Sequence, residues 1–208
     1  MTHTLHRHGA AEDLQDDYTV ICMAAAGYNV AGSGPGLKRF LTVALEHDAI
    51  NFGDIMTGSP FNAEPQDIIN SIKDGSIVHA VFAAKEKLVA FLRAIKDEDL
   101  GLSVVVQGVC SQVEDALSQI GQQPHTINTS LGIWGRSERL ADHNTLRITT
   151  MCGHALVSKN LVAHLVKGIR AGRIGVKSAA EELAAQCVCG VFNPNRAERI
   201  LREMVESK

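Results

Sequence analysis

The sequence is poor in aromatic residues, has no excess of charge of either sign and contains no long hydrophobic run. Its 208 residues include one Trp, two Tyr and six Phe, too few for the aromatic platforms that stack single-stranded nucleic acid. Twenty basic residues stand against twenty-three acidic ones, giving a formal net charge of −3 at pH 7. This balance lacks the positive surface that binds nucleic-acid phosphates. We therefore expect no nucleic-acid partner.

The beginning of the chain has no apolar core. Residues 1–17 are rich in His and acidic side chains, whereas secretory signals and membrane spans need a continuous apolar stretch. We expect no membrane attachment and a cytoplasmic protein. The five cysteines are an odd number without the spacing of a disulfide framework. In a reducing compartment such thiols favour metal binding or chemistry.

Short apolar runs alternate with segments of helical period along the first two thirds of the chain. A composition of 45% hydrophobic and 21% charged residues suits one well-cored domain. The glycines and proline of residues 51–64 predict an irregular loop. The alternation predicts right-handed crossovers and an α/β fold with a mainly parallel sheet and flanking helices. The predicted strands are 18–25, 77–83, 102–107, 125–133 and 146–151, and the predicted helices are 37–45, 65–72, 85–97 and 109–120.

The part of the chain after Gly153 has a helical pattern throughout. One helix is expected to end at Gly172, a second covers 179–186, and a third begins at Asn193-Pro194. We expect residues 1–208 to form a single domain, with 1–17 a poorly defined N-terminal arm and 152–208 a helical metal-binding subdomain. The apolar stripe of the last helix, which includes Ile200 and Met204, suits either internal packing or a homo-oligomer.

Two one-residue-spaced pairs carry the strongest chemical signal. Cys152 and His154 form the first pair, and Cys187 and Cys189 form the second. The 35 residues from Cys152 to Cys187 (187 − 152) match one long and one short helix that run out and back. That path would bring the pairs together. Thiolates and imidazole are the preferred donors for zinc, and three thiolates supply most of the ligands of an iron–sulfur cluster.

The spacing leaves the choice between zinc and a cluster open. Structural zinc ligands usually come in pairs separated by two to four residues, and both pairs depart from that rule. Our first hypothesis is a 4Fe–4S cluster held by Cys152, Cys187 and Cys189, with one iron open or bound by His154. The alternative is a structural Cys3His zinc site in a non-catalytic binding or assembly protein. Cys110 is an additional thiolate without local support.

An open iron would act as a Lewis acid toward a small anionic substrate, which suits lyase or dehydratase chemistry. We expect His154 or His6 to transfer the proton. Arg7 or Arg196 would pair with the anion.

The predicted strand 125–133 has one polar face. With a period of two residues, Thr126, Asn128 and Ser130 point the same way. Asn128 and Ser130 are therefore candidate substrate-binding residues. The same face also suits the solvent side of an edge strand.

Overall fold

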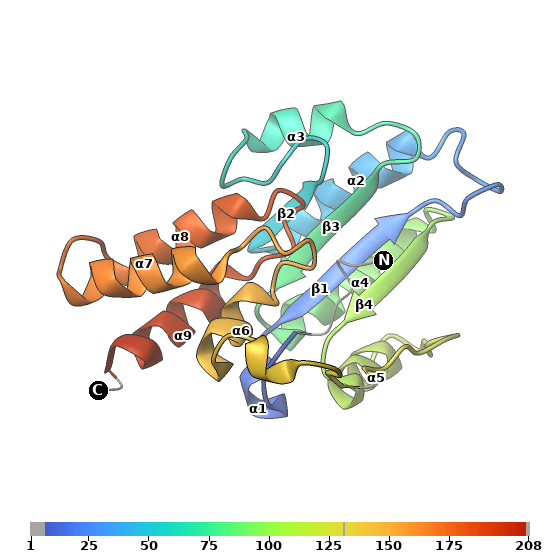
Figure 1. Cartoon of the computed structure of the whole chain (residues 1–208). Coiled ribbons are helices and arrows are strands. Elements are labelled where there is room, and N and C mark those ends of the chain that lie inside the picture. Colours follow the sequence, from blue (N-terminus) through green and yellow to red (C-terminus); the bar gives the residue numbers. More distant parts are fainter. Residues whose placement is uncertain (1–6, 131, 207–208) are drawn as a thin grey trace.

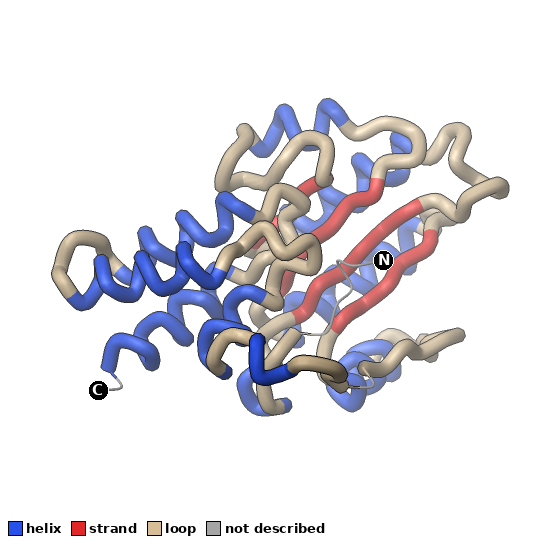
Figure 2. The backbone as a smooth tube through the Cα atoms, in the orientation of Figure 1, coloured by secondary structure: helices blue, strands red, loops and turns tan. Residues whose placement is uncertain are grey.

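The computed structural model describes residues 7–130 and 132–206, which form a sheet with helices on one face and a group of helices beside it (Figure 1). The strands pair in the order β2-β3-β1-β4, and every neighbouring pair is antiparallel. Helices α2 (Gly34–Glu46) and α4 (Lys85–Glu98) cover one face of the sheet, and α6 to α9 (143–206) form a group of helices beside it (Figure 2). The strands are β1 (Tyr18–Met23), β2 (Asn51–Asp54), β3 (Ile77–Phe82) and β4 (Ser103–Gln107).

The prediction of a mainly parallel sheet is wrong, because no parallel pair occurs among the described strands. One predicted connection nevertheless exists, from strand 77–83 through helix 85–97 to strand 102–107, although these strands are not neighbours in the sheet. β1 and β2 run in the same direction with β3 inserted between them, and β3 and β4 run in the same direction with β1 between them. This is the split β-α-β arrangement of ferredoxin-like sheets, here with α3 added between β2 and β3. The sequence pattern predicted the connection from β3 to β4 but neither β2, which was expected to be a loop, nor the strand inserted between each pair.

Most helices coincide with the predicted helical segments. The last three confirm the helical C-terminal part, and Gly172 follows the end of α7 with a φ of 66°. The helices are α1 (Ala11–Leu14), α2 (Gly34–Glu46), α3 (Pro65–Ser71), α4 (Lys85–Glu98), α5 (Cys110–Ser118), α6 (His143–Thr149), α7 (Lys159–Arg170), α8 (Val176–Gln186) and α9 (Pro194–Glu206).

Three local predictions are wrong. The predicted loop 51–64 contains β2, which pairs with β3. The predicted strand 146–151 lies largely in α6, because the Asp142 side chain accepts a hydrogen bond from the Thr145 N–H and caps that helix. Burial of Ile148 against the other C-terminal helices then outweighs the β-propensity of the segment. In the described part of 125–133 there is no strand.

Two separate hydrophobic clusters form the interior. The first lies between the sheet and the helices that cover it and includes Phe40, Phe82 and Phe91. The ring of Phe91 contacts both other rings, with centroids 5.2 Å and 4.8 Å away. The second cluster fills the space among α6, α7, α8 and α9 and includes Phe192 and three of the five cysteines. Within each helix and strand the residues of these clusters recur with the period of that element, as expected for amphipathic elements.

A buried group of ion pairs joins these two parts. Asp17, just before β1, accepts hydrogen bonds from Arg7 at 2.7 Å and from Arg196 of α9 at 3.2 Å. Asp13 of α1 contacts Arg196 and Arg147, each at 2.5 Å. The side chains of Asp17 and Arg196 have no exposed surface. We call these five residues the arginine–aspartate network.

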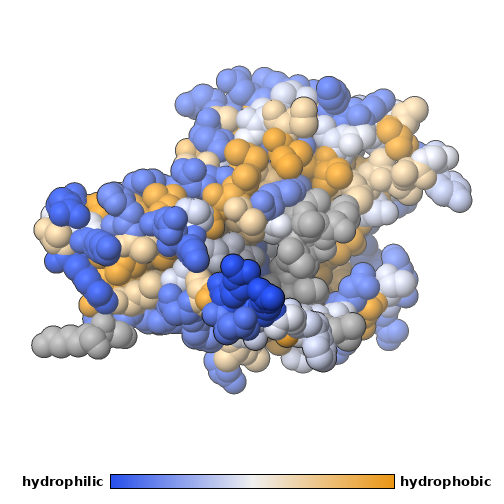
Figure 3. Space-filling model, in the orientation of Figure 1, coloured by the Kyte–Doolittle hydropathy of each residue, from blue (hydrophilic) through white to orange (hydrophobic). Residues whose placement is uncertain are grey.

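None of the described helices has both the length and the apolar character that a bilayer crossing requires. On the face drawn in Figure 3 the periphery is mostly hydrophilic, and hydrophobic residues gather above the centre. Individual apolar side chains also stand out in loops, notably Tyr28, Met56 and Trp134. Single exposed apolar residues are ordinary.

We expect Asp13→Asn to lower the free energy of unfolding by about 2 to 3 kcal/mol at neutral pH, because it leaves the buried Arg196 charge short of a partner. Burial raises the pKa of Asp13, but hydrogen bonds from Arg147 and Arg196 outweigh it and hold that pKa well below the ordinary 3.8. The stabilisation is therefore complete above pH 3.8 and is lost as the pH falls below it.

Urea unfolding of wild type and variant at pH 7 and at about pH 3 measures both effects. The difference in the free energy of unfolding between wild type and Asp13→Asn should be smaller at the lower pH. Asp48→Asn is the matched control, since the Asp48–Lys87 pair is exposed and should contribute little. An equal loss from the two variants would contradict a structural role for the network.

Candidate functional site

The four metal-type side chains come from two loops that meet beside β2. Cys152 and His154 lie in the turn between α6 and α7, and Cys187 and Cys189 lie in the connection from α8 to α9. The Sγ atoms of Cys187 and Cys189 are 3.8 Å apart. The Nδ1 atom of His154 is 3.6 Å from Cys189 Sγ, and the Cys152 thiol hydrogen-bonds with that of Cys187. The two pairs thus form one continuous group of contacts, the thiol–imidazole cluster.

Hydrogen bonds among the three thiols shift their pKa values in different directions. The bond with Cys187, together with burial, raises the pKa of Cys152. For Cys187 the bond with Cys152 lowers the pKa, but the bond with Cys189 and burial raise it to about 12. The bond from Cys187 lowers the pKa of Cys189. Cys189, in contact with His154, is therefore the thiol that ionises most readily.

The backbone of β2 holds the second pair in place. A Cβ atom on Gly190 would collide with the Phe52 carbonyl, so only glycine allows the turn to approach the strand this closely. Gly190 also has a φ of 74°, a conformation that other residues adopt at a cost. The Asn51 side chain donates to the Phe192 carbonyl at 2.8 Å just beyond the turn. The cluster therefore lies where the sheet meets the helical part.

The cluster is closed to solvent on its thiol side. Cys187 and Cys189 have no exposed surface, and Cys152 is 3% exposed, whereas His154 is half-buried. Within residues 7–130 and 132–206, no three His, Cys, Asp or Glu side chains are already arranged to hold a metal ion together. The sequence predicted that the C-terminal helical segment carries a formed metal-type cluster, and this prediction is wrong for the described residues. The side chains meet in pairs rather than around a common centre.

Two of the predicted catalytic and anion-binding residues lie in the buried group of ion pairs. Arg7 and Arg196 both hydrogen-bond with Asp17 inside the arginine–aspartate network. His6 lies outside the described residues. The sequence analysis missed Asp13 and Asp17, whose only signal was their place beside a His-rich stretch. It also missed the contact of His8 Nε2 with His143 Nδ1 at 2.9 Å.

Asn128, Ser130 and Arg7 all line a cleft of about 1020 Å³. The cleft runs along β4 and α5 and is closed on one side by residues 122–130. None of the four residues of the thiol–imidazole cluster is part of its described lining. The structure thus separates the predicted metal residues from the predicted substrate-binding residues.

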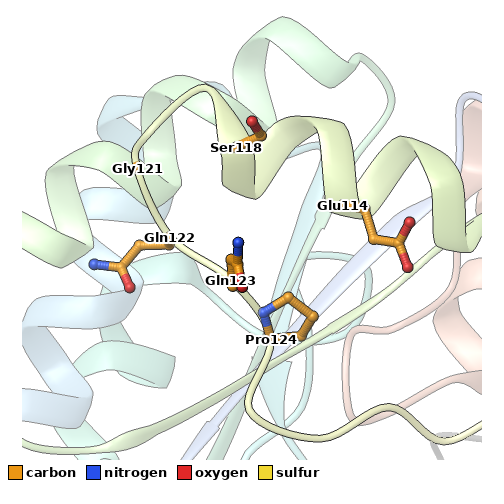
Figure 4. A pocket seen from close by; sticks show the side chains of 6 residues that line it. All are labelled: Glu114, Ser118, Gly121, Gln122, Gln123 and Pro124. Atoms are coloured by element: carbon orange, nitrogen blue, oxygen red, sulfur yellow. The ribbon is translucent and has the colours of Figure 1, made fainter.

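Around the C-terminal end of α5 the cleft continues into a second hollow. Figure 4 shows Glu114 and Ser118 on the helix and Gln123 and Pro124 on the chain that returns beneath it. Glu114 and residues 122–124 line both spaces. The returning chain is therefore the wall that the two hollows share.

Comparison with protein-family models, with curated proteins and with solved structures finds no significant match for the chain.

We expect Gly190→Ala to lower the free energy of unfolding by about 3 kcal/mol or more, because it combines a left-handed backbone with a collision against β2. Gly172→Ala is the control, since Gly172 has a φ of 66° but nothing within 4 Å of the added carbon. That change should cost only about 1 kcal/mol. Chemical denaturation measures both, and equal losses would show that the approach of the turn to β2 is not tight.

Proposed function

We propose that Cys152, His154, Cys187 and Cys189 bind one zinc ion and that the protein is a non-catalytic binding or assembly protein stabilised by this zinc. The observation that carries the proposal is the pair of donor distances, 3.8 Å between two sulfur atoms and 3.6 Å between sulfur and nitrogen. Zinc–sulfur distances of about 2.3 Å and zinc–nitrogen distances of about 2.0 Å place tetrahedral donors about 3.8 Å and 3.5 Å apart. Two edges of the required tetrahedron therefore have the right length.

To complete the tetrahedron, Cys152 and His154 would have to move toward the position of the ion. Cys187 and Cys189 are held by the turn against β2, while Cys152 and His154 lie in the separate α6–α7 turn. The Cys152 thiol already hydrogen-bonds with Cys187, so its sulfur lies next to the second pair. Binding would exchange the thiol protons for metal bonds, as zinc sites require.

Donor separation favours zinc over a cluster. Each thiolate of a 4Fe–4S cluster binds a different iron atom, so its ligands lie farther apart than ligands that share one ion. Sulfur atoms in contact leave no room for iron and sulfide between them. The iron–sulfur lyase with a small anionic substrate stays a prediction, and metal analysis separates it from the zinc site.

Burial favours a structural role for the ion. A catalytic zinc keeps one coordination position for water or substrate, whereas a structural zinc has four protein ligands. Here four side chains are available and the thiols are buried. The ion would fasten the two interhelical turns to each other and, through Gly190, to β2. The need for reduced thiols also supports a cytoplasmic location.

We expect the purified protein to carry one zinc ion per chain, and Cys189→Ser to reduce both the zinc content and the melting temperature. Cys110→Ser is the matched control, because Cys110 is exposed and lies outside the cluster. Elemental analysis for zinc and iron, assay of acid-labile sulfide and thermal unfolding give the readouts. A strong chelator should lower the melting temperature of the wild type and have little effect on Cys189→Ser.

Substitution of His154 tests whether the imidazole is a ligand. If it is, His154→Gln lowers zinc content and thermal stability together. Retention of full zinc with unchanged stability would remove His154 from the proposed set. A brown protein with iron and sulfide would overturn the zinc proposal in favour of the cluster, and a protein without any of these metals would overturn both.

A further inference from the structure

The hairpin formed by α7 and α8 carries charge of one sign only. Residues 159–180 contain five Lys or Arg residues and no Asp or Glu. The rest of the chain therefore has 15 basic residues (20 − 5) against 23 acidic ones, a net charge of −8. A segment of one sign in a chain of the opposite sign creates a local potential that attracts partners of complementary charge. The hairpin is thus a basic surface on an otherwise acidic protein.

Four of these cations lie at the tip of the hairpin. α7 ends at Arg170 and α8 begins after the turn 171–175, and this end of the pair projects away from the sheet (Figure 1). The Arg173 N–H donates to the Gly168 carbonyl at 2.9 Å, which closes the turn onto the last turn of α7. We call the four exposed residues the basic tip: Lys167, Arg170, Arg173 and Lys177.

Few carboxylates balance the charge of the basic tip. Lys167 and Arg173 have no ion-pair partner among the described residues. Lys177 pairs with Glu181 at 3.9 Å, but both side chains are largely exposed, so this contact contributes little. Arg170 donates to a backbone carbonyl of α9, which is uncharged. The tip therefore retains positive charge that faces solvent.

Helix stability accounts for only part of this charge. Lys167 and Arg170 lie in the last turn of α7, where a cation complements the helix dipole. Lys159 and Lys177 lie in the first turns of α7 and α8, where a cation opposes the dipole. Cations at these two positions weaken the helices, so the all-basic pattern points to binding rather than to folding.

We propose that the basic tip binds a short segment rich in Asp and Glu of a partner protein. Such a segment contacts the tip alone, because charges farther away than about 8 Å are largely screened at physiological ionic strength. A long polyanion such as nucleic acid would extend over the rest of the chain, whose net charge of −8 repels it. Residues 159–177, all of them described, expose no large hydrophobic side chain that could enter an anionic membrane. The inference rests on the proposed role as a binding protein but not on the zinc ion.

Binding of a fluorescently labelled polyglutamate peptide to the full chain, measured by fluorescence anisotropy, tests the proposal. The wild type should bind at about 50 mM salt and at least about threefold more weakly at about 200 mM, because salt screens the exposed charges. Lys167→Glu with Arg173→Glu should weaken binding at least about tenfold. Lys167→Arg with Arg173→Lys keeps the charge and should retain the affinity. The matched control is Lys73→Glu with Arg136→Glu, which changes the net charge equally at exposed positions outside the hairpin.

Several outcomes would overturn the inference. One is a wild type that does not bind the peptide, and another is an equal loss of affinity in the control. Tighter binding of single-stranded DNA or of phosphatidylserine vesicles than of the peptide would assign the tip to nucleic acid or to a membrane instead. Circular dichroism and zinc content are measured on the same preparations. A zinc-loaded wild type that does not bind the peptide overturns this inference alone, and a zinc-free wild type that binds it overturns only the zinc site.

Discussion

The position of the C-terminal helices depends on the buried guanidinium of Arg196. It donates to Asp17, to Asp13 and to the backbone carbonyls of His8 and Arg147, and thereby ties α9 to the residues before β1 and to α6. A buried charge is costly unless it is fully paired, so this arrangement loses much of its stability when one partner is missing. Arg196 therefore holds α9 against α6 and the residues before β1.

That position decides the surroundings of the thiol–imidazole cluster. With α9 fixed, the connection from α8 passes over β2, where Gly190 permits direct backbone contact. The thiols are then enclosed between the second hydrophobic cluster and the strand. Soft donors in a dry, closed location favour a metal that holds structure over one that meets substrate. Ion pairs, glycine contact and proposed zinc thus act on the same junction.

The residues that the sequence analysis combined in one site do not all lie together, because the four metal-type residues are apart from the cleft that Arg7, Asn128 and Ser130 line. Arg7 and Arg196 are engaged in the arginine–aspartate network and have their charges balanced there. Asn128 and Ser130 lie on the cleft beside β4, whose described lining contains none of the four metal-type residues. The anion site expected from these residues stays a prediction.

The sequence by itself determined most of the local structure. Periodicity was sufficient for β1, α4 and α9, and the one-residue pairs with their 35-residue separation correctly indicated that two loops would meet. It did not reveal that β3 enters between β1 and β2, because strand order depends on contacts between distant residues. Nor did it show the role of Arg196, whose partner Asp17 is 179 residues away. Only the tertiary structure decided these, since pairing of buried charges and strand edges depends on proximity in space rather than along the chain.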